Sequence, residues 1–170
     1  AAATVIDNTI TLSDADDTQM TGATVRISTG LSSGDVLSFA TRGNISGTYD
    51  SVTGVLTLSG TDSVANYQAA LRTVEYSSTS EDPTASSASR SITWAVTDAN
   101  SGGLGTQTST GVTSTINVTA VNDAPVAVAD VAEAKEAGGT GNETAGTNPT
   151  GNVLSDGQNN DSDVDNAPST

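Results

Sequence analysis

The chain has 170 residues, a formal net charge of −15, and neither cysteine nor histidine. The absence of those two residue types excludes disulfides, thiolate nucleophiles, serine–histidine catalytic pairs and the usual zinc sites. Its five basic residues are scattered singly, so the sequence predicts no positive stripe that could neutralise phosphates. No apolar run approaches the length of a membrane span. We therefore expect no nucleic-acid partner and no membrane insertion, and we expect the carboxylates to bind hard, oxygen-preferring cations.

Residues 1–125 show the alternation of apolar and polar residues that is typical of β-strands, with turn residues about every ten positions. The predicted strands are Thr4–Leu12, Ala23–Ser28, Val36–Ala40, Ile45–Tyr49, Val55–Ser59, Thr73–Ser77, Ser91–Thr97 and Val112–Val121. This number of short strands predicts an all-β Greek-key sandwich.

The apolar positions within these segments predict the core of the sandwich. It comprises Val25, Ile27, Leu37, Phe39, Leu56, Leu58, Leu71, Tyr76, Ile92, Trp94, Val96, Ile116 and Val118. Trp94 alternates with Ile92 and Val96, which favours a core position over a sugar-stacking role on the surface.

One segment departs from the strand alternation. Residues 62–72 open on Asp62 and Ser63, residue types that cap helices, and carry apolar residues at Val64, Tyr67 and Leu71. This spacing predicts a short helix that crosses between the two sheets.

The composition of the chain changes at Pro125. All of the aromatic residues precede this proline, whereas residues 126–170 carry nearly half of the net negative charge. We therefore predict one domain over 1–125 and a linker with the opening of a second, partial domain over 126–170. Residues 125–132 have the composition of a strand but no core of their own, so this segment could be flexible or could add to the sheet of a neighbouring domain or molecule.

Several sequence blocks, in one order, resemble the cadherin-like repeats of giant bacterial surface adhesins of the RTX and VCBS types. The blocks are Leu12–Asp16, Gly34–Phe39, Gly54–Gly60, Tyr67–Tyr76 and the closing Val121–Val126. Residues 126–170 in turn resemble the start of a VCBS-type repeat. The resemblance implies a cadherin-like or Ig-like sandwich that is secreted to the bacterial cell surface, contacts adjacent repeats of the same protein, and serves cell adhesion or biofilm formation without being an enzyme.

Acidic clusters at turns predict calcium ligation, because Ca²⁺ takes six to eight oxygens from carboxylates, amides and backbone carbonyls. The candidate ligands are Asp14, Asp16 and Asp17; Asp98 and Asn100; Asn122 and Asp123; and the tail residues Asp161, Asp163 and Asp165. The resemblance to cadherins implies that Asp98, Asn122 and Asp123 share one pole of the sandwich. Plain turn chemistry for residues 14–17 and an unstructured acidic tail for residues 161–165 remain as alternatives.

Three other functions remain to be compared with a calcium-stabilised structural or adhesive repeat. Strand addition between molecules would make the chain a subunit of an extracellular filament. A carbohydrate-binding module is disfavoured by the few aromatic residues, so surface glycans are expected to be bound through other domains. Glycoside hydrolysis would need a specific pair of carboxylates, and no feature of the sequence selects one.

Overall fold

The computed structural model describes residues 2–129, 131–148 and 161–163. The chain divides into two compact units, residues 1–120 and residues 121–170. The sequence-based boundary at Pro125 lies five residues inside the second unit.

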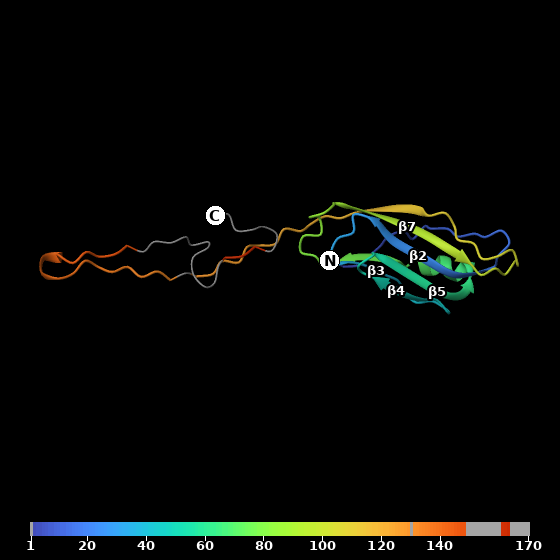
Figure 1. The fold of residues 1–170 in the computed structure, drawn as a ribbon, viewed down its shortest axis with the longest axis horizontal. Helices are drawn as coiled ribbons and strands as arrows, with labels where there is room; N and C mark the ends of the chain where they lie inside the picture. The colour runs from blue at the N-terminus through green and yellow to red at the C-terminus, as the bar shows by residue number, and fades with distance from the viewer. Residues whose placement is uncertain (1, 130, 149–160, 164–170) are drawn as a thin grey trace. The chain divides into compact units, whose positions relative to one another are not determined.

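The first unit is an antiparallel β-sandwich, which confirms the predicted all-β fold (Figure 1). One sheet has the strand order β1-β6-β3, and the other has the order β4-β5-β2-β7-β8. The strands are β1 (Thr4–Val5), β2 (Gln19–Thr29), β3 (Asp35–Ser38), β4 (Ser46–Asp50), β5 (Val55–Ser63), β6 (Glu75–Ser78), β7 (Ser89–Asp98) and β8 (Val112–Asn117). The long strands β2 and β7 pair along most of their length, with Val25 opposite Trp94 and Met20 opposite Asp98.

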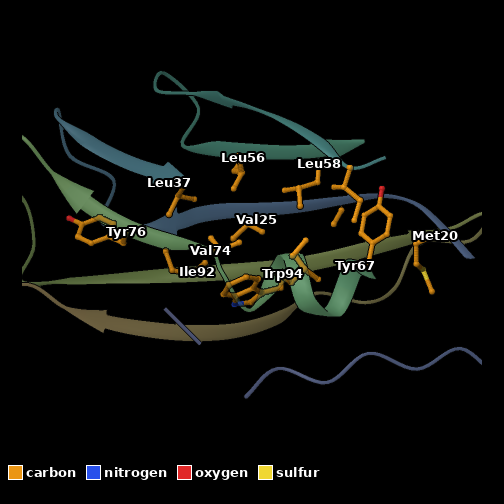
Figure 2. Close-up of a cluster of buried hydrophobic side chains, with 14 of the residues drawn as sticks. Met20, Val25, Leu37, Leu56, Leu58, Tyr67, Val74, Tyr76, Ile92 and Trp94 are labelled. Atoms are coloured by element: carbon orange, nitrogen blue, oxygen red, sulfur yellow. The ribbon is translucent and has the colours of Figure 1, made fainter. Parts of the chain in front are cut away.

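The core lies between the two sheets and is built from the inward positions of the strands (Figure 2). Val25, Leu37, Leu56 and Ile92 are buried, as their alternation predicts. Trp94 is only 2% exposed and donates its indole N–H to the Ser114 hydroxyl at 3.1 Å, so it belongs to the core and cannot stack on a sugar. The other predicted core residues are buried or half-buried; Phe39, Val96, Ile116 and Val118 are among the half-buried ones.

The predicted helix is confirmed as α1 (Val64–Leu71), which joins β5 of one sheet to β6 of the other. Ser63 caps its first turn, because the Ser63 hydroxyl accepts a hydrogen bond from Asn66 N. Tyr67 and Leu71 are buried residues of the helix and belong to the core. The Tyr67 hydroxyl donates to the carbonyl of Gly60 at 2.6 Å, which fastens the helix to the strand before it.

The first and the last predicted strands are shorter than expected by several residues. The strand predicted over Thr4–Leu12 extends only over β1, because the Asp7 carboxylate accepts hydrogen bonds from the backbone and hydroxyl of Thr9 and thereby forms a local turn. The strand predicted over Val112–Val121 ends at Asn117, which pairs with Ser89, the first residue of its partner β7.

The core also holds a charged pair that the sequence analysis did not predict. The Arg90 side chain on β7 contacts the Asp35 carboxylate on β3, with Nε to Oδ2 at 2.6 Å and Nη2 to Oδ1 at 3.3 Å. Both side chains are fully buried. The Tyr76 hydroxyl on β6 donates to Asp35 Oδ1 at 2.7 Å, and the Tyr49 hydroxyl on β4 donates to the Asp35 carbonyl at 2.9 Å. This network therefore links strands of both sheets.

In the second unit, the described residues form isolated bridges rather than extended strands. The bridges pair Val126 with Ser162, Lys135 with Thr147 and Gly138 with Thr144. A single 3-10 turn, η1 (Thr140–Asn142), follows Gly139. Of the segment predicted to have strand character, only Val126 takes part in a bridge among the described residues.

Candidate metal centre

The loop before β2 gathers three carboxylates. Asp14, Asp16 and Asp17 each offer an oxygen within 4.8 Å of the other two. Asp14 Oδ1 accepts hydrogen bonds from Asp16 N at 3.2 Å and from Asp17 N at 2.9 Å, which curls the loop around the Asp14 side chain. The local sequence therefore brings all three acidic groups together in one turn.

Asp17 connects this loop to the loop that follows β7. The carboxylate of Asp17, which is only 7% exposed, accepts hydrogen bonds from the hydroxyl of Ser101 and, at 2.7 Å, from the backbone N–H of Gly102. In return, Thr18 N donates to the Ser101 hydroxyl at 3.1 Å. Gly102 lies so close to Asp16 that an added Cβ would stand 3.3 Å from Asp16 Oδ2. Two loops more than 80 residues apart in sequence thus form one acidic surface.

Among the described residues, no basic side chain forms an ion pair with Asp14, Asp16 or Asp17. The negative charges of this loop are therefore not neutralised within the described part of the chain. Hydrogen bonds from the backbone of Asp17 and Asp16 lower the pKa of Asp14, so this group stays ionised at neutral pH. Partial desolvation and the neighbouring charge of Asp14 raise the pKa of Asp16. A cation between these carboxylates would relieve the repulsion that raises the Asp16 pKa.

The predicted ligands Asp98 and Asn100 lie at the same end of the sandwich but serve their own loop. Asp98 ends β7 opposite Met20, and its two carboxylate oxygens accept hydrogen bonds from Asn100 N at 3.1 Å and Gln107 N at 2.8 Å. Asn100 adopts a φ of +53° and accepts a hydrogen bond from Gly105 N through its side-chain oxygen at 2.6 Å. Asp98 does not belong to the group of three carboxylates, and the hydrogen bonds of Asp98 and Asn100 stabilise their own loop.

The remaining predicted ligands belong to the second unit. Asn122 donates its side-chain amide to the carbonyl of Asp123 at 2.9 Å. Asp161 Oδ1 accepts a hydrogen bond from Val128 N at 2.7 Å, and Asp163 lies two residues further on. Asp165 lies outside the described residues. A common site for Asp98, Asn122 and Asp123 stays a prediction, because these residues fall in different units.

The donor set of the first loop fits a hard divalent cation. Carboxylate oxygens are the ligands that Ca²⁺ prefers, and three carboxylates can supply between three and six of the six to eight oxygens it needs. The nearby Ser101 hydroxyl and Gly102 backbone were not predicted as part of this region, because nothing in the sequence indicates which distant loop will face residues 14–17. The arrangement can bind an ion and tie two loops together.

The comparisons with known proteins give one informative match. The chain is 47% identical over 88 residues to "Halomucin" of Haloquadratum walsbyi, and the matched stretch is 48% of this chain. The same stretch is 1% of Halomucin, so the relative is a very long protein in which such a segment is a small part. No protein family matches the chain. No solved structure gives a significant match.

Proposed function

We propose that this chain is a calcium-stabilised structural repeat of a large surface or extracellular protein. Its role is mechanical: copies joined end to end would space an adhesive or protective part away from the cell. No catalytic role is assigned to it. The partners proposed for it are adjacent repeats of the same protein.

This proposal rests on the hydrogen-bonded contact between the loop before β2 and the loop after β7. Three carboxylates gather in the loop before β2, and one of them, Asp17, is held by Ser101 and Gly102 from the loop after β7. A cation bound there would favour the folded sandwich, because only in the folded state does the distant loop fix Asp17 beside the other two carboxylates. Calcium would therefore act as a removable stabiliser of a structural domain.

The match to Halomucin supports the proposed place of this chain as one module of a large protein. A segment that makes up 1% of a long protein is the size expected of one module among many, and the name Halomucin describes the relative as a mucin. No helix in the described part of this chain is long and apolar enough to span a membrane. The acidity of the chain also suits a role outside the cell, where divalent cations are available to offset carboxylate repulsion.

Thermal unfolding with and without calcium tests this function. A ligand that binds only the folded state at about 100 times its Kd adds about 2.7 kcal/mol to the free energy of unfolding. For a sandwich of this size, that corresponds to an increase in Tm on the order of 10 °C. We expect the Tm measured by circular dichroism to rise in CaCl2 and to return to its lower value when EDTA is added in excess.

Single substitutions test which carboxylates cause the calcium-dependent rise in Tm. Asp16→Asn removes one ligand charge from the cluster without removing the hydrogen bonds that shape the loop, and we expect it to abolish most of the calcium-dependent rise in Tm. Asp82→Asn is the matched control, because Asp82 is an exposed turn aspartate that accepts hydrogen bonds from Thr84 but lies outside the cluster. An identical Tm in CaCl2 and EDTA, or an Asp16→Asn chain that responds like the Asp82→Asn chain, would contradict the proposed site.

A further inference from the structure

A second candidate site lies on the outer face of the five-stranded sheet, opposite the core. An open depression of about 420 Å³ is lined by Arg26, Thr48, Asp50, Thr53, Val55 and Thr57. These residues come from β2, β4, β5 and the β4–β5 turn, and the strand pairing places Thr48 beside Thr57 and Val55 between Asp50 and Arg26.

Arg26 is the unusual member of this surface. The Arg26 guanidinium makes no ion pair and no hydrogen bond with any described residue, whereas Arg90 is paired with Asp35 and Arg72 donates to the carbonyl of Ile10. In a chain with a net charge of −15, a cation that the protein itself leaves without a partner is available to an external anion. A planar guanidinium matches a carboxylate through two parallel hydrogen bonds.

Asp50 defines the opposite side of the depression. Its carboxylate accepts hydrogen bonds from Val52 N at 2.9 Å and from the Thr53 hydroxyl at 2.8 Å, and these bonds lower its pKa, so it is ionised at neutral pH. Arg26 and Asp50 stand two strands apart, and neighbouring strands are spaced by about 4.8 Å, so their backbones are roughly 10 Å apart. This span is sufficient for a sugar ring with its substituents.

We propose that this depression binds an acidic saccharide, with the carboxylate of a uronic acid on Arg26 and ring hydroxyls on Asp50, Thr48 and Thr57. The half-buried Val55 between the two charged residues offers an apolar surface for the C–H face of the ring. The threonine hydroxyls and the Asp50 carboxylate can both accept hydrogen bonds from sugar hydroxyls.

The arrangement of charges selects this class of ligand over other anions. A densely charged phosphate or sulfate group would meet the ionised Asp50 and the strongly negative field of the chain. A saccharide with a single carboxylate at one end and hydroxyl donors at the other satisfies both sides. No aromatic residue lines the depression, so polar contacts alone would hold the sugar. Binding to one module is then weak, and many modules in one long protein would raise the overall avidity.

Titration of the full chain followed by two-dimensional NMR tests this inference. The probe is a trisaccharide of two glucose residues that ends in a single glucuronic acid, with maltotriose as the neutral comparison and the calcium concentration held constant. We expect saturable shifts of the amide signals of Arg26, Thr48 and Thr57 with the acidic probe, and affinity for maltotriose at least about tenfold lower, because one charge-assisted contact is absent.

Two variants make the assignment specific. Arg26→Gln is expected to weaken binding of the acidic trisaccharide by about tenfold or more, whereas the matched control Arg42→Gln, at an exposed arginine outside the depression, is expected to leave it unchanged. The site does not depend on the proposed metal, so the folded Asp16→Asn chain is expected to bind the probe with unchanged affinity. The inference is overturned if the acidic probe gives no saturable shift, if maltotriose binds equally well, or if Arg26→Gln binds like Arg42→Gln.

Discussion

The buried pair of Arg90 and Asp35 makes a sharp prediction for the stability of the sandwich. Replacing Arg90 with methionine removes both contacts to the Asp35 carboxylate, at 2.6 and 3.3 Å, but retains most of the apolar side chain. Asp35 would keep hydrogen bonds from the Tyr76 hydroxyl and from Ser32 N, yet its charge would have no counterion in a fully buried position.

The expected cost follows from that missing counterion. Removing one partner of a buried ion pair typically lowers the free energy of unfolding by 3–5 kcal/mol, because the remaining charge is desolvated without compensation. The substitution also frees the carbonyls of Ser87 and Pro83, which accept from Arg90 at 2.6 and 2.7 Å. We therefore expect a loss of about 4 kcal/mol, a large share of the 5–15 kcal/mol typical of a whole domain.

Urea unfolding followed by circular dichroism measures this loss. Arg42→Met is the matched control, because Arg42 is exposed and its contact with Asn66 is long at 3.5 Å, so we expect a change below about 1 kcal/mol. If Arg90→Met does not fold, Arg90→Lys keeps a positive charge and provides a measurable intermediate. The double variant Arg90→Met with Asp35→Asn should be more stable than Arg90→Met alone, since it removes the orphaned charge. A loss no larger than that of Arg42→Met would refute the reasoning.

The same pair predicts how stability depends on pH. Burial alone would raise the pKa of Asp35, but hydrogen bonds from Arg90, Tyr76 and Ser32 outweigh it and lower the pKa below its ordinary value. A depressed pKa in the folded state contributes stability above the unfolded pKa of about 3.9, and this contribution is lost as the pH falls through the folded pKa. Asp35→Asn should therefore lack this part of the acid sensitivity of the parent chain. The hydroxyl of Tyr76, whose pKa burial and Asp35 raise to about 12, remains a donor throughout.

Two further predictions concern the backbone and the second unit. Gly60 has a φ of +118° and an added Cβ would stand 2.1 Å from the carbonyl oxygen of Asn44, so Gly60→Ala should cost about 2 kcal/mol or more in urea unfolding, whereas Gly103→Ala, with no atom in the way, should cost less. A chain ending at Pro125 should sediment as a monomer with the Tm of the full chain; oligomers formed only by the full chain would instead support strand donation by residues 126–170.

The fold could largely be predicted because its signals are local. Alternation places Leu56 and Leu58 on one face of β5, and the helical spacing of Tyr67 and Leu71 interrupts the strands at the point where the chain changes sheets. The strand ends were less predictable because they depend on partners. β8 stops where β7 begins, and β1 stops where Asp7 turns the chain, and in neither case does residue composition indicate the boundary.

The polar networks were harder to predict than the core, for the same physical reason. Arg90 has the same alternation parity as Ile92 and Trp94, so its inward direction could have been inferred from the strand pattern. Its partner Asp35 could not, because the pairing depends on how the two sheets face each other across 55 positions of sequence. The contact of Asp17 with Ser101 is non-local in the same way, whereas the acidic loop around Asp14 is local and was predicted.

Strand β7 runs between two acidic groups that differ in whether a basic side chain pairs with them. At its start, Arg90 neutralises the buried Asp35 with a permanent internal counterion. At its end, roughly 25 Å away at about 3.3 Å per residue, Asp98 stands near the loop of Asp14, Asp16 and Asp17, where no described basic side chain forms an ion pair. The buried Asp35 at the first end therefore has a counterion within the chain, whereas at the second end our proposal assigns that role to an external cation. We therefore expect calcium to stabilise the end of the sandwich that holds residues 14–17. The carboxylates there form no ion pair with a described basic side chain, whereas the buried Asp35 at the other end already has Arg90.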